Sequence, residues 1–280
     1  MIATAPMLVD GMSDAEYHGD REHLSQSGAK LLLPPSCPAK FKWVRDNGRA
    51  PRRAFDFGHA AHAVALGRGL DLVVVDAPDW RTKAAKEAQD AARTEGKVPL
   101  LAEEMARVNA MAEKLHEHPI ARVLLDPDGG APEQSAFWVD EATGVPCRAR
   151  FDWLPHGDGG GRMIISDYKT AVSANPIAFG KSSWDYGYAG QDQWYTDAAR
   201  ALGLADDLAF VFIVQEKEPP YIVTVVELDA EAKRIGRERN RLARDTYAEC
   251  VAADRWPGYT DDVALASLPG WAVCQHEESL

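Results

Sequence analysis

The chain has 280 residues, of which 46% are hydrophobic and 26% charged, a balance that is ordinary for a globular protein in water. It contains no apolar run long enough to cross a membrane, and residues 1–20 lack the cationic start and apolar stretch of a secretory signal. We therefore expect a cytoplasmic protein without membrane contact. The formal net charge of −12 argues against a nucleic-acid partner, unless the charge is unevenly distributed.

The basic residues are indeed unevenly distributed. One short stretch holds Lys40, Lys42, Arg45, Arg49, Arg52 and Arg53. A locally basic lip on an acidic protein can steer DNA. The same stretch is also typical of a solvated helix face, so charge alone leaves both interpretations open.

The first half of the chain is predicted to be mainly helical. Residues 1–26 lack periodicity and are expected to be irregular. Serines at 25 and 27 can cap a short helix that ends at the double proline 34–35. Further helices are expected at 38–47, 56–67, 80–95 and 101–125, with glycine and proline separating the last two.

The pattern changes after residue 127. Strands are predicted at 134–139, 145–154, 163–168, 209–215 and 221–228, with helices at 189–202 and 230–253. This order predicts an α/β fold, in which helices flank a mixed central β-sheet and a helical region precedes it. We expect one domain over 1–280, with a helical part at 1–126, a sheet core at 127–228, and a C-terminal helix and tail at 229–280.

Carboxylates end two of the predicted strands. Side chains alternate along a strand, so Asp167 and Lys169 share one face, as do Arg148, Arg150 and Asp152, opposite Cys147, Ala149, Phe151 and Trp153. If the two strands form a hairpin, Asp152 and Asp167 approach one another and favour a hard cation such as Mg²⁺. Ordinary ion pairs, Asp167 with Lys169 or Asp152 with Arg150, explain the same residues equally well.

Three further residues are candidates by position. His59 begins the polar edge of an otherwise apolar helix, where a histidine is more often a core residue than a ligand. Gln191 and Tyr195 lie four residues apart, on one helix face. Such a pair alone is more often part of a helix surface.

Taken in order, these residues resemble a known family. The motifs of the RecB-like branch of the PD-(D/E)XK nucleases are similar to five elements of this chain. These are Gly58-His59, Glu133, Asp152, Asp167-Tyr168-Lys169 and Gln191-x-x-x-Tyr195. The opening LSQSGAKLLLPPSCPAKFKW and the WPGY…LPGW ending resemble the exonuclease VIII (RecE-like) group of phages and prophages. One departure is that Arg-Phe-Asp stands where the superfamily often has Pro-Asp.

The resemblance implies a Mg²⁺-dependent exodeoxyribonuclease, with Mn²⁺ able to substitute. Asp152, Asp167, the Tyr168 carbonyl and His59 would hold the metal, while Lys169 would orient the attacking water and Glu133 would add an acidic group. Gln191 and Tyr195 would position the DNA strand or brace the site, and we expect Arg148 and Arg150 to contact DNA as well. Linear DNA ends, a single-strand annealing protein and a homo-oligomer are the implied partners.

Three alternatives stay open. An iron–sulfur nuclease of the Cas4 or AddB type places one cysteine early and three close together late, whereas Cys37, Cys147, Cys250 and Cys274 are scattered. A DNA-binding module that has lost catalysis would share the fold. A structural protein with coincidental ion pairs would bind no metal.

Overall fold

The computed structural model describes residues 5–48, 53–157 and 161–279. At its centre is a seven-stranded mixed sheet in the order β1-β5-β6-β7-β8-β9, with β2 paired to β6. Its strands are β1 (Met7–Val9), β2 (Leu24–Ser25), β5 (Gly130–Val139), β6 (Pro146–Pro155), β7 (Met163–Ala171), β8 (Leu208–Glu216) and β9 (Val223–Glu227). The pairs β7–β8 and β2–β6 are parallel and the others antiparallel. The predicted α/β fold with a mixed central sheet is confirmed.

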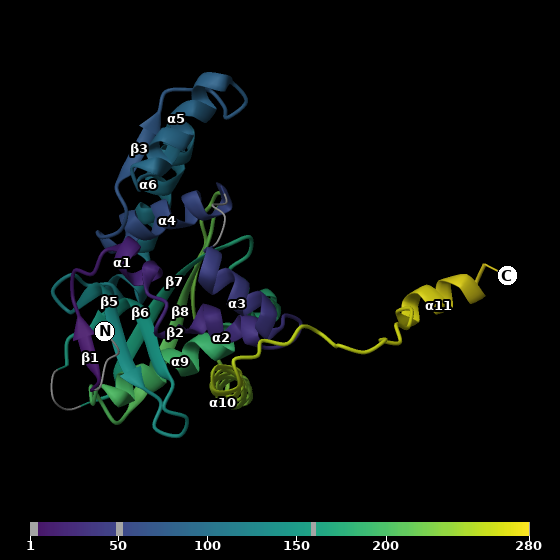
Figure 1. Cartoon of the computed structure of the whole chain (residues 1–280). Coiled ribbons are helices and arrows are strands. Elements are labelled where there is room, and N and C mark those ends of the chain that lie inside the picture. Colours follow the sequence, from purple (N-terminus) through teal and green to yellow (C-terminus); the bar gives the residue numbers. More distant parts are fainter. Residues whose placement is uncertain (1–4, 49–52, 158–160, 280) are drawn as a thin grey trace.

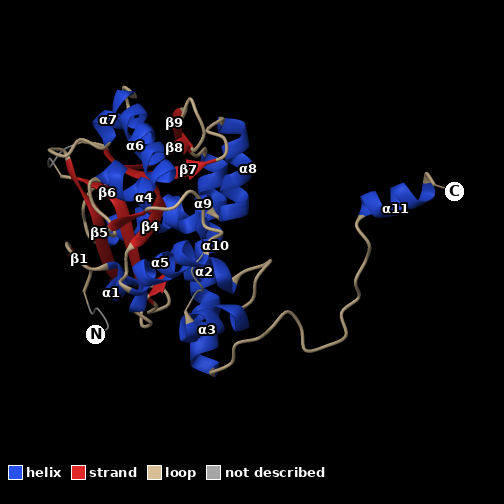
Figure 2. Ribbon diagram, turned by 90° about the horizontal axis from the view of Figure 1, so that it is seen from above, coloured by secondary structure: helices blue, strands red, loops and turns tan. Residues whose placement is uncertain are grey.

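Helices cover both faces of this sheet (Figure 2). The helices that precede β5 are α1 (Asp14–Gly19), α2 (Gln26–Leu32), α3 (Pro38–Asn47), α4 (Arg53–Leu66), α5 (Lys83–Thr94), α6 (Ala102–Glu117) and α7 (Ala121–Leu124). Those that follow β7 are α8 (Pro176–Tyr186), α9 (Tyr188–Ala201), α10 (Ala230–Ala253) and α11 (Gly270–Glu277). One face packs on α2, α9 and α10, and the other packs on α4, α6 and α7.

The side-chain alternation of β8 shows how the two layers form. Phe210 and Phe212 point into the cluster that contains Trp194 of α9, whereas Ile213 points into the cluster that contains Met111 of α6. All five side chains are nearly or fully buried. A strand that is apolar on both faces belongs at the centre of a sheet covered on both sides.

The strands and helices predicted after residue 127 are all present, with ends shifted by a few residues. Helix α8 was not predicted. The predicted helix 101–125 is divided into α6 and α7 at Pro119, which has no backbone N–H to continue the helical hydrogen bonds.

The N-terminal part, predicted to be mainly helical, also contains four short strands that were not predicted. The residues expected to be irregular form β1, α1 and β2, and both strands join the main sheet. Two further strands, β3 (Leu72–Val75) and β4 (Val98–Leu101), pair in parallel and flank α5 in a lobe that projects from the body (Figure 1).

The chain ends in an extended arm. Trp256 stacks on Phe41 of α3, and Tyr259 contacts Lys40 of the same helix. Beyond them the backbone leaves the body and carries α11 away from it (Figure 1). Val263 and Leu265 on this arm are almost fully exposed. None of the described helices is both long and apolar enough to cross a membrane.

Candidate metal centre

Glu133 and Asp152 face each other across β5 and β6. The register pairs Pro132 with Trp153 and Gln134 with Phe151, so these two acidic residues stand between the two pairs. Glu133 has a φ of 55°, a left-handed conformation that a residue with a side chain adopts only under constraint. Strain of this kind is concentrated at functional sites.

The side-chain alternation of β6 also changes at Asp152. Phe151 packs in the cluster on the α9 side, whereas Trp153 packs in the cluster on the α6 side. The prediction that Trp153 shares the face of Cys147, Ala149 and Phe151 was therefore wrong. Regular alternation requires an unbroken pleat, and β6 is irregular opposite the strained Glu133.

Asp152 and Asp167 come together as the predicted hairpin required. Asp152 Oδ2 accepts a hydrogen bond of 3.0 Å from the backbone N–H of Tyr168, directly after Asp167. Burial raises the pKa of Asp167 most strongly, and the nearby Asp152 carboxylate raises it further. The same two causes raise the pKa of Glu133 to about 8. Each of these acids is therefore destabilised in its charged form.

Lys169 and Gln191 complete the surroundings of Asp167. The Lys169 ammonium forms an ion pair with Asp167 Oδ2, and Gln191 Nε2 donates a hydrogen bond of 2.6 Å to Asp167 Oδ1. Burial lowers the pKa of Lys169, but the Asp167 and Asp152 carboxylates outweigh it and leave the pKa above its ordinary value. Tyr195, one turn after Gln191, is in side-chain contact with it, and burial raises the Tyr195 pKa. The structure thus brings Asp152, Asp167, Lys169, Gln191 and Tyr195 into one place.

The histidine at this centre is His62, three residues after the predicted His59. His62 Nε2 lies 2.6 Å from the Tyr168 carbonyl oxygen and 3.4 Å from Asp152 Oδ2. His59 also lines the cleft in which this centre lies, but its side chain is exposed. The buried face of α4 explains the difference. His62 lies one turn before the buried Ala65 and Leu66, so it is on the same face of the helix as these residues. The spacing of His62 to these apolar residues was the sequence signal that could have identified it.

These side chains suit a divalent cation. One ligand atom each from His62, Glu133 and Asp152 lies within 4.8 Å of the other two, and this is the one such group found among the described residues. Burial lowers the pKa of His62, which favours the neutral imidazole that a metal requires. Carboxylates and a backbone carbonyl are hard oxygen ligands, so they fit Mg²⁺ or Mn²⁺. A cation here would also relieve the repulsion between the acids.

Arg148 and Arg150 line the cleft around this centre, but little of either side chain is exposed. Both are buried, and their guanidinium groups lie 4.8 Å and 4.2 Å from the ring centre of Tyr17. Arg150 also donates to Asp14, and Arg148 to the carbonyl of Asp20. These contacts attach α1 and the turn after it to the sheet. The predicted alternation holds from Cys147 to Phe151, but it could not reveal that α1 covers the face of Arg148 and Arg150.

The basic stretch after residue 40 is only partly described. Lys40 contacts Tyr259, Lys42 pairs with Asp46, and Arg45 lies 5.0 Å from the ring centre of Trp256. Arg49 and Arg52 lie outside the described residues, as does the Arg53 side chain. The described members therefore have intramolecular partners.

The four cysteines are free and come from separate parts of the fold. Three of them are buried, and Cys274 is exposed on α11. The metal-ligating group found among the described residues contains no cysteine. This arrangement does not favour the iron–sulfur alternative.

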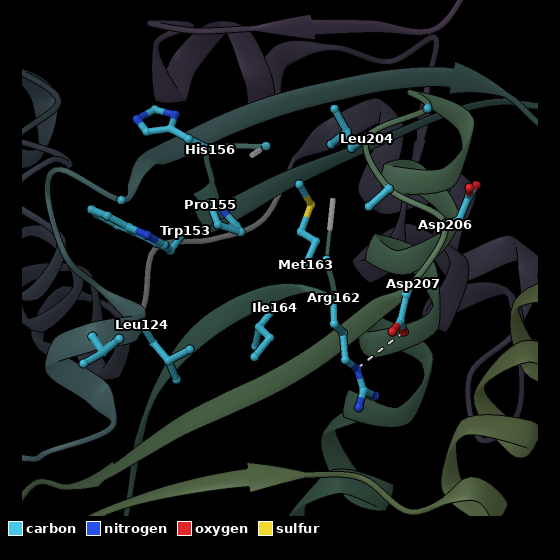
Figure 3. Close-up of a pocket in the computed structure, with 16 residues that line it drawn as sticks. Leu124, Trp153, Pro155, His156, Arg162, Met163, Ile164, Leu204, Asp206 and Asp207 are labelled. Atoms are coloured by element: carbon cyan, nitrogen blue, oxygen red, sulfur yellow. Dashed lines mark ion pairs between the residues drawn. The ribbon is translucent and has the colours of Figure 1, made fainter. Parts of the chain in front are cut away.

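The candidate centre lines a large cleft of about 1280 Å³, between α1, α2 and α4 on one side and the strands on the other. A second cavity of about 720 Å³ lies where β6 ends and β7 begins (Figure 3). Its lining includes Trp153, Met163 and an ion pair of 3.5 Å between Arg162 and Asp207. Glu133 and Asp152 line the larger cleft, and the buried Asp167 is paired with Lys169, which also lines it.

Comparison with known proteins gives a consistent result. The model of a family described as "PDDEXK-like domain of unknown function (DUF3799)" matches residues 25–269. The crystal structure of a "Putative exonuclease" from Eubacterium rectale aligns with a TM-score of 0.63 at 11% sequence identity, over 95% of this chain and 98% of that one. The structure of SSO0001 aligns at a TM-score of 0.27 and 14% identity, over 68% of this chain and 85% of that one, too weakly to indicate a common fold. No curated protein matches the sequence.

Proposed function

Because the chain belongs to the PDDEXK-like family DUF3799, we propose that it is a nuclease that uses Mg²⁺ to remove nucleotides from the ends of linear, double-stranded DNA. The observation that carries the proposal is the meeting of Asp152, Asp167 and Lys169 with Glu133 and His62 in one cleft. Mn²⁺ is expected to substitute for Mg²⁺, since both prefer oxygen ligands.

Each residue has a role that follows from its contacts. His62, Glu133, Asp152, Asp167 and the Tyr168 carbonyl would hold the cation. When bound, the cation activates a water molecule and neutralises charge at the scissile phosphate. Gln191 keeps the Asp167 carboxylate in place through its hydrogen bond. Lys169 presents a positive charge that can orient the water and stabilise the charge that develops on the phosphate oxygens.

The exonuclease assignment goes further than the site chemistry alone. It is supported by the similarity of the motifs to the RecE-like group, and by the name of the structurally similar Eubacterium rectale protein. A role in phage-type recombination, with a single-strand annealing protein as partner and a homo-oligomer as the working form, follows from the same similarity. Arg148 and Arg150 line the cleft but are largely buried and bonded to Asp20 and Asp14, so we expect them to support the cleft wall and not to contact DNA directly.

The test is digestion of linear and of covalently closed circular duplex DNA, each with Mg²⁺ and with EDTA. The enzyme variants are Asp167→Asn and Lys169→Met, with Asp262→Asn on the exposed arm as the control. We expect Mg²⁺-dependent loss of the linear DNA alone. Each site variant should lower the rate by at least about 100-fold, since both alter charge stabilisation at the phosphate, and the control should match the wild type.

Two results would contradict the proposal in different ways. Nicking of the closed circle would indicate an endonuclease of the same superfamily. DNA that is shifted on a gel but never cut would indicate a binding module without catalysis.

A further inference from the structure

An exposed aromatic side chain stands at the rim of the catalytic cleft. Tyr186 ends α8, lines the cleft, and has 62% of its surface exposed. Its ring lies 5.7 Å from that of Tyr188, and the Tyr188 ring centre lies 5.5 Å from the Lys169 ammonium. A row of two rings therefore leads outward from the lysine of the proposed active site.

The two rings differ in how they are held. Tyr188 is packed against Phe179 and Phe212, so its position is fixed by the core. Gly187 separates Tyr188 from Tyr186 in a left-handed conformation, with a φ of 75°. A Cβ at Gly187 would lie 3.2 Å from Lys30, so the turn that presents Tyr186 depends on glycine. Tyr186 is the ring that remains available to a ligand.

A cation accompanies the exposed ring. The Lys30 ammonium lies 5.9 Å from the centre of the Tyr186 ring, and it also donates to the carbonyl of Asp185. Trp184, on the same helix, is 66% exposed and has the Arg239 guanidinium 5.4 Å from its ring centre. Exposed rings paired with cations are the combination that binds single-stranded nucleic acid, where the ring stacks on a base and the cation meets the backbone.

We propose that Tyr186 is a stacking platform for an unpaired base of the DNA strand whose backbone enters the cleft, with Lys30 contacting the adjoining phosphate. Bases inside a duplex are stacked on their neighbours, so their faces are closed to a side chain. The strand must therefore be unpaired where it crosses the rim. This rests on the proposed nuclease function and specifies its substrate: an end that is already single-stranded or that frays on binding.

Binding without cleavage tests the platform directly. The anisotropy of a fluorescein-labelled oligodeoxythymidylate is measured in EDTA with wild type, Tyr186→Ala, Tyr186→Phe and Trp271→Ala. Loss of one stacking contact should weaken binding roughly 5- to 100-fold in Tyr186→Ala. Tyr186→Phe keeps the ring and should bind as the wild type does. Trp271 is an exposed ring on α11, away from the cleft, so its loss should have no effect.

The result of this binding test does not depend on whether the protein is a nuclease. Unchanged binding by Tyr186→Ala, at an unchanged melting temperature, would overturn the platform even if the wild type digests DNA. Equal weakening of a blunt hairpin duplex and of the single strand would also overturn it, because the ring would then not select unpaired bases. Selective loss of single-strand binding would support it, even if the wild type cut no DNA.

Discussion

The imidazoles of His59 and His62 lie on the same helix but in different surroundings. His62 lies between the Asp152 carboxylate and the Tyr168 carbonyl, whereas His59 is exposed. If His62 holds the metal, His62→Ala should lower the DNA cleavage rate by about 10- to 100-fold or more. His59→Ala, the matched control, should stay close to wild type.

The rates should be measured at saturating and at limiting Mg²⁺. A ligand variant is expected to recover in part when the metal concentration is raised, because its loss acts on metal affinity. A larger loss of cleavage rate in His59→Ala than in His62→Ala would mean that His59, and not His62, holds the metal.

Asp152 and Asp167 could be predicted from the sequence because alternation along neighbouring strands is a local property, whereas Glu133 was indicated only by the family resemblance. Asp167 and Lys169 share a face by strand alternation, and a hairpin brings Asp152 to them. The roles of Arg148 and Arg150 could not be predicted in this way, since what covers them is α1, more than a hundred residues earlier in the chain. His62 differs from His59 in sharing the helix face of the buried Ala65 and Leu66, a periodic signal that is present in the sequence.

The packing of α9 against α10 depends on Gly236. A Cβ at this position would lie 2.1 Å from the carbonyl oxygen of Ala189, and backbone cannot move aside easily. Gly236→Ala should therefore destabilise the fold by about 1–3 kcal/mol, although alanine favours helices. Urea unfolding followed by circular dichroism measures the change.

Gly180 of α8 provides the control for this prediction. Apart from the backbone of its own helix, no atom lies within 4 Å of a Cβ at this position, so Gly180→Ala should be neutral or stabilising by up to about 1 kcal/mol. If both variants had the same stability, the close approach of α10 to Ala189 would not exist in solution.

Elements with strong periodicity could be predicted, and short ones could not. The alternation in β5, β6 and β7 and the long charged pattern of α10 carry enough residues to show their type. Strands β1 and β2 have three and two residues, too few to show a period. They are strands because β5 and β6 pair with them, which is a tertiary effect.

At the scale of the whole molecule, the arm after Thr260 contributes little to the fold. Apart from Ala272, its described side chains are exposed, and none of them belongs to a hydrophobic cluster. A chain that ends at Thr260 should melt within about 2 °C of the full chain.

A chain that ends at Ala253 is the contrasting variant. It also loses Trp256, which stacks on Phe41 and meets Arg45, so it should melt at a clearly lower temperature. A large decrease for the chain that ends at Thr260 would mean that the arm packs on the body in solution.

The central claim is that the convergent carboxylates hold a divalent cation, and calorimetric titration of MgCl₂ into the DNA-free protein tests it most directly. Wild type and Asp207→Asn, a control in the second cavity, should bind the metal alike. Asp152→Asn should bind it at least about tenfold more weakly, since it loses a charged oxygen ligand. Absence of binding by the wild type, or equal binding by Asp152→Asn, would contradict the account.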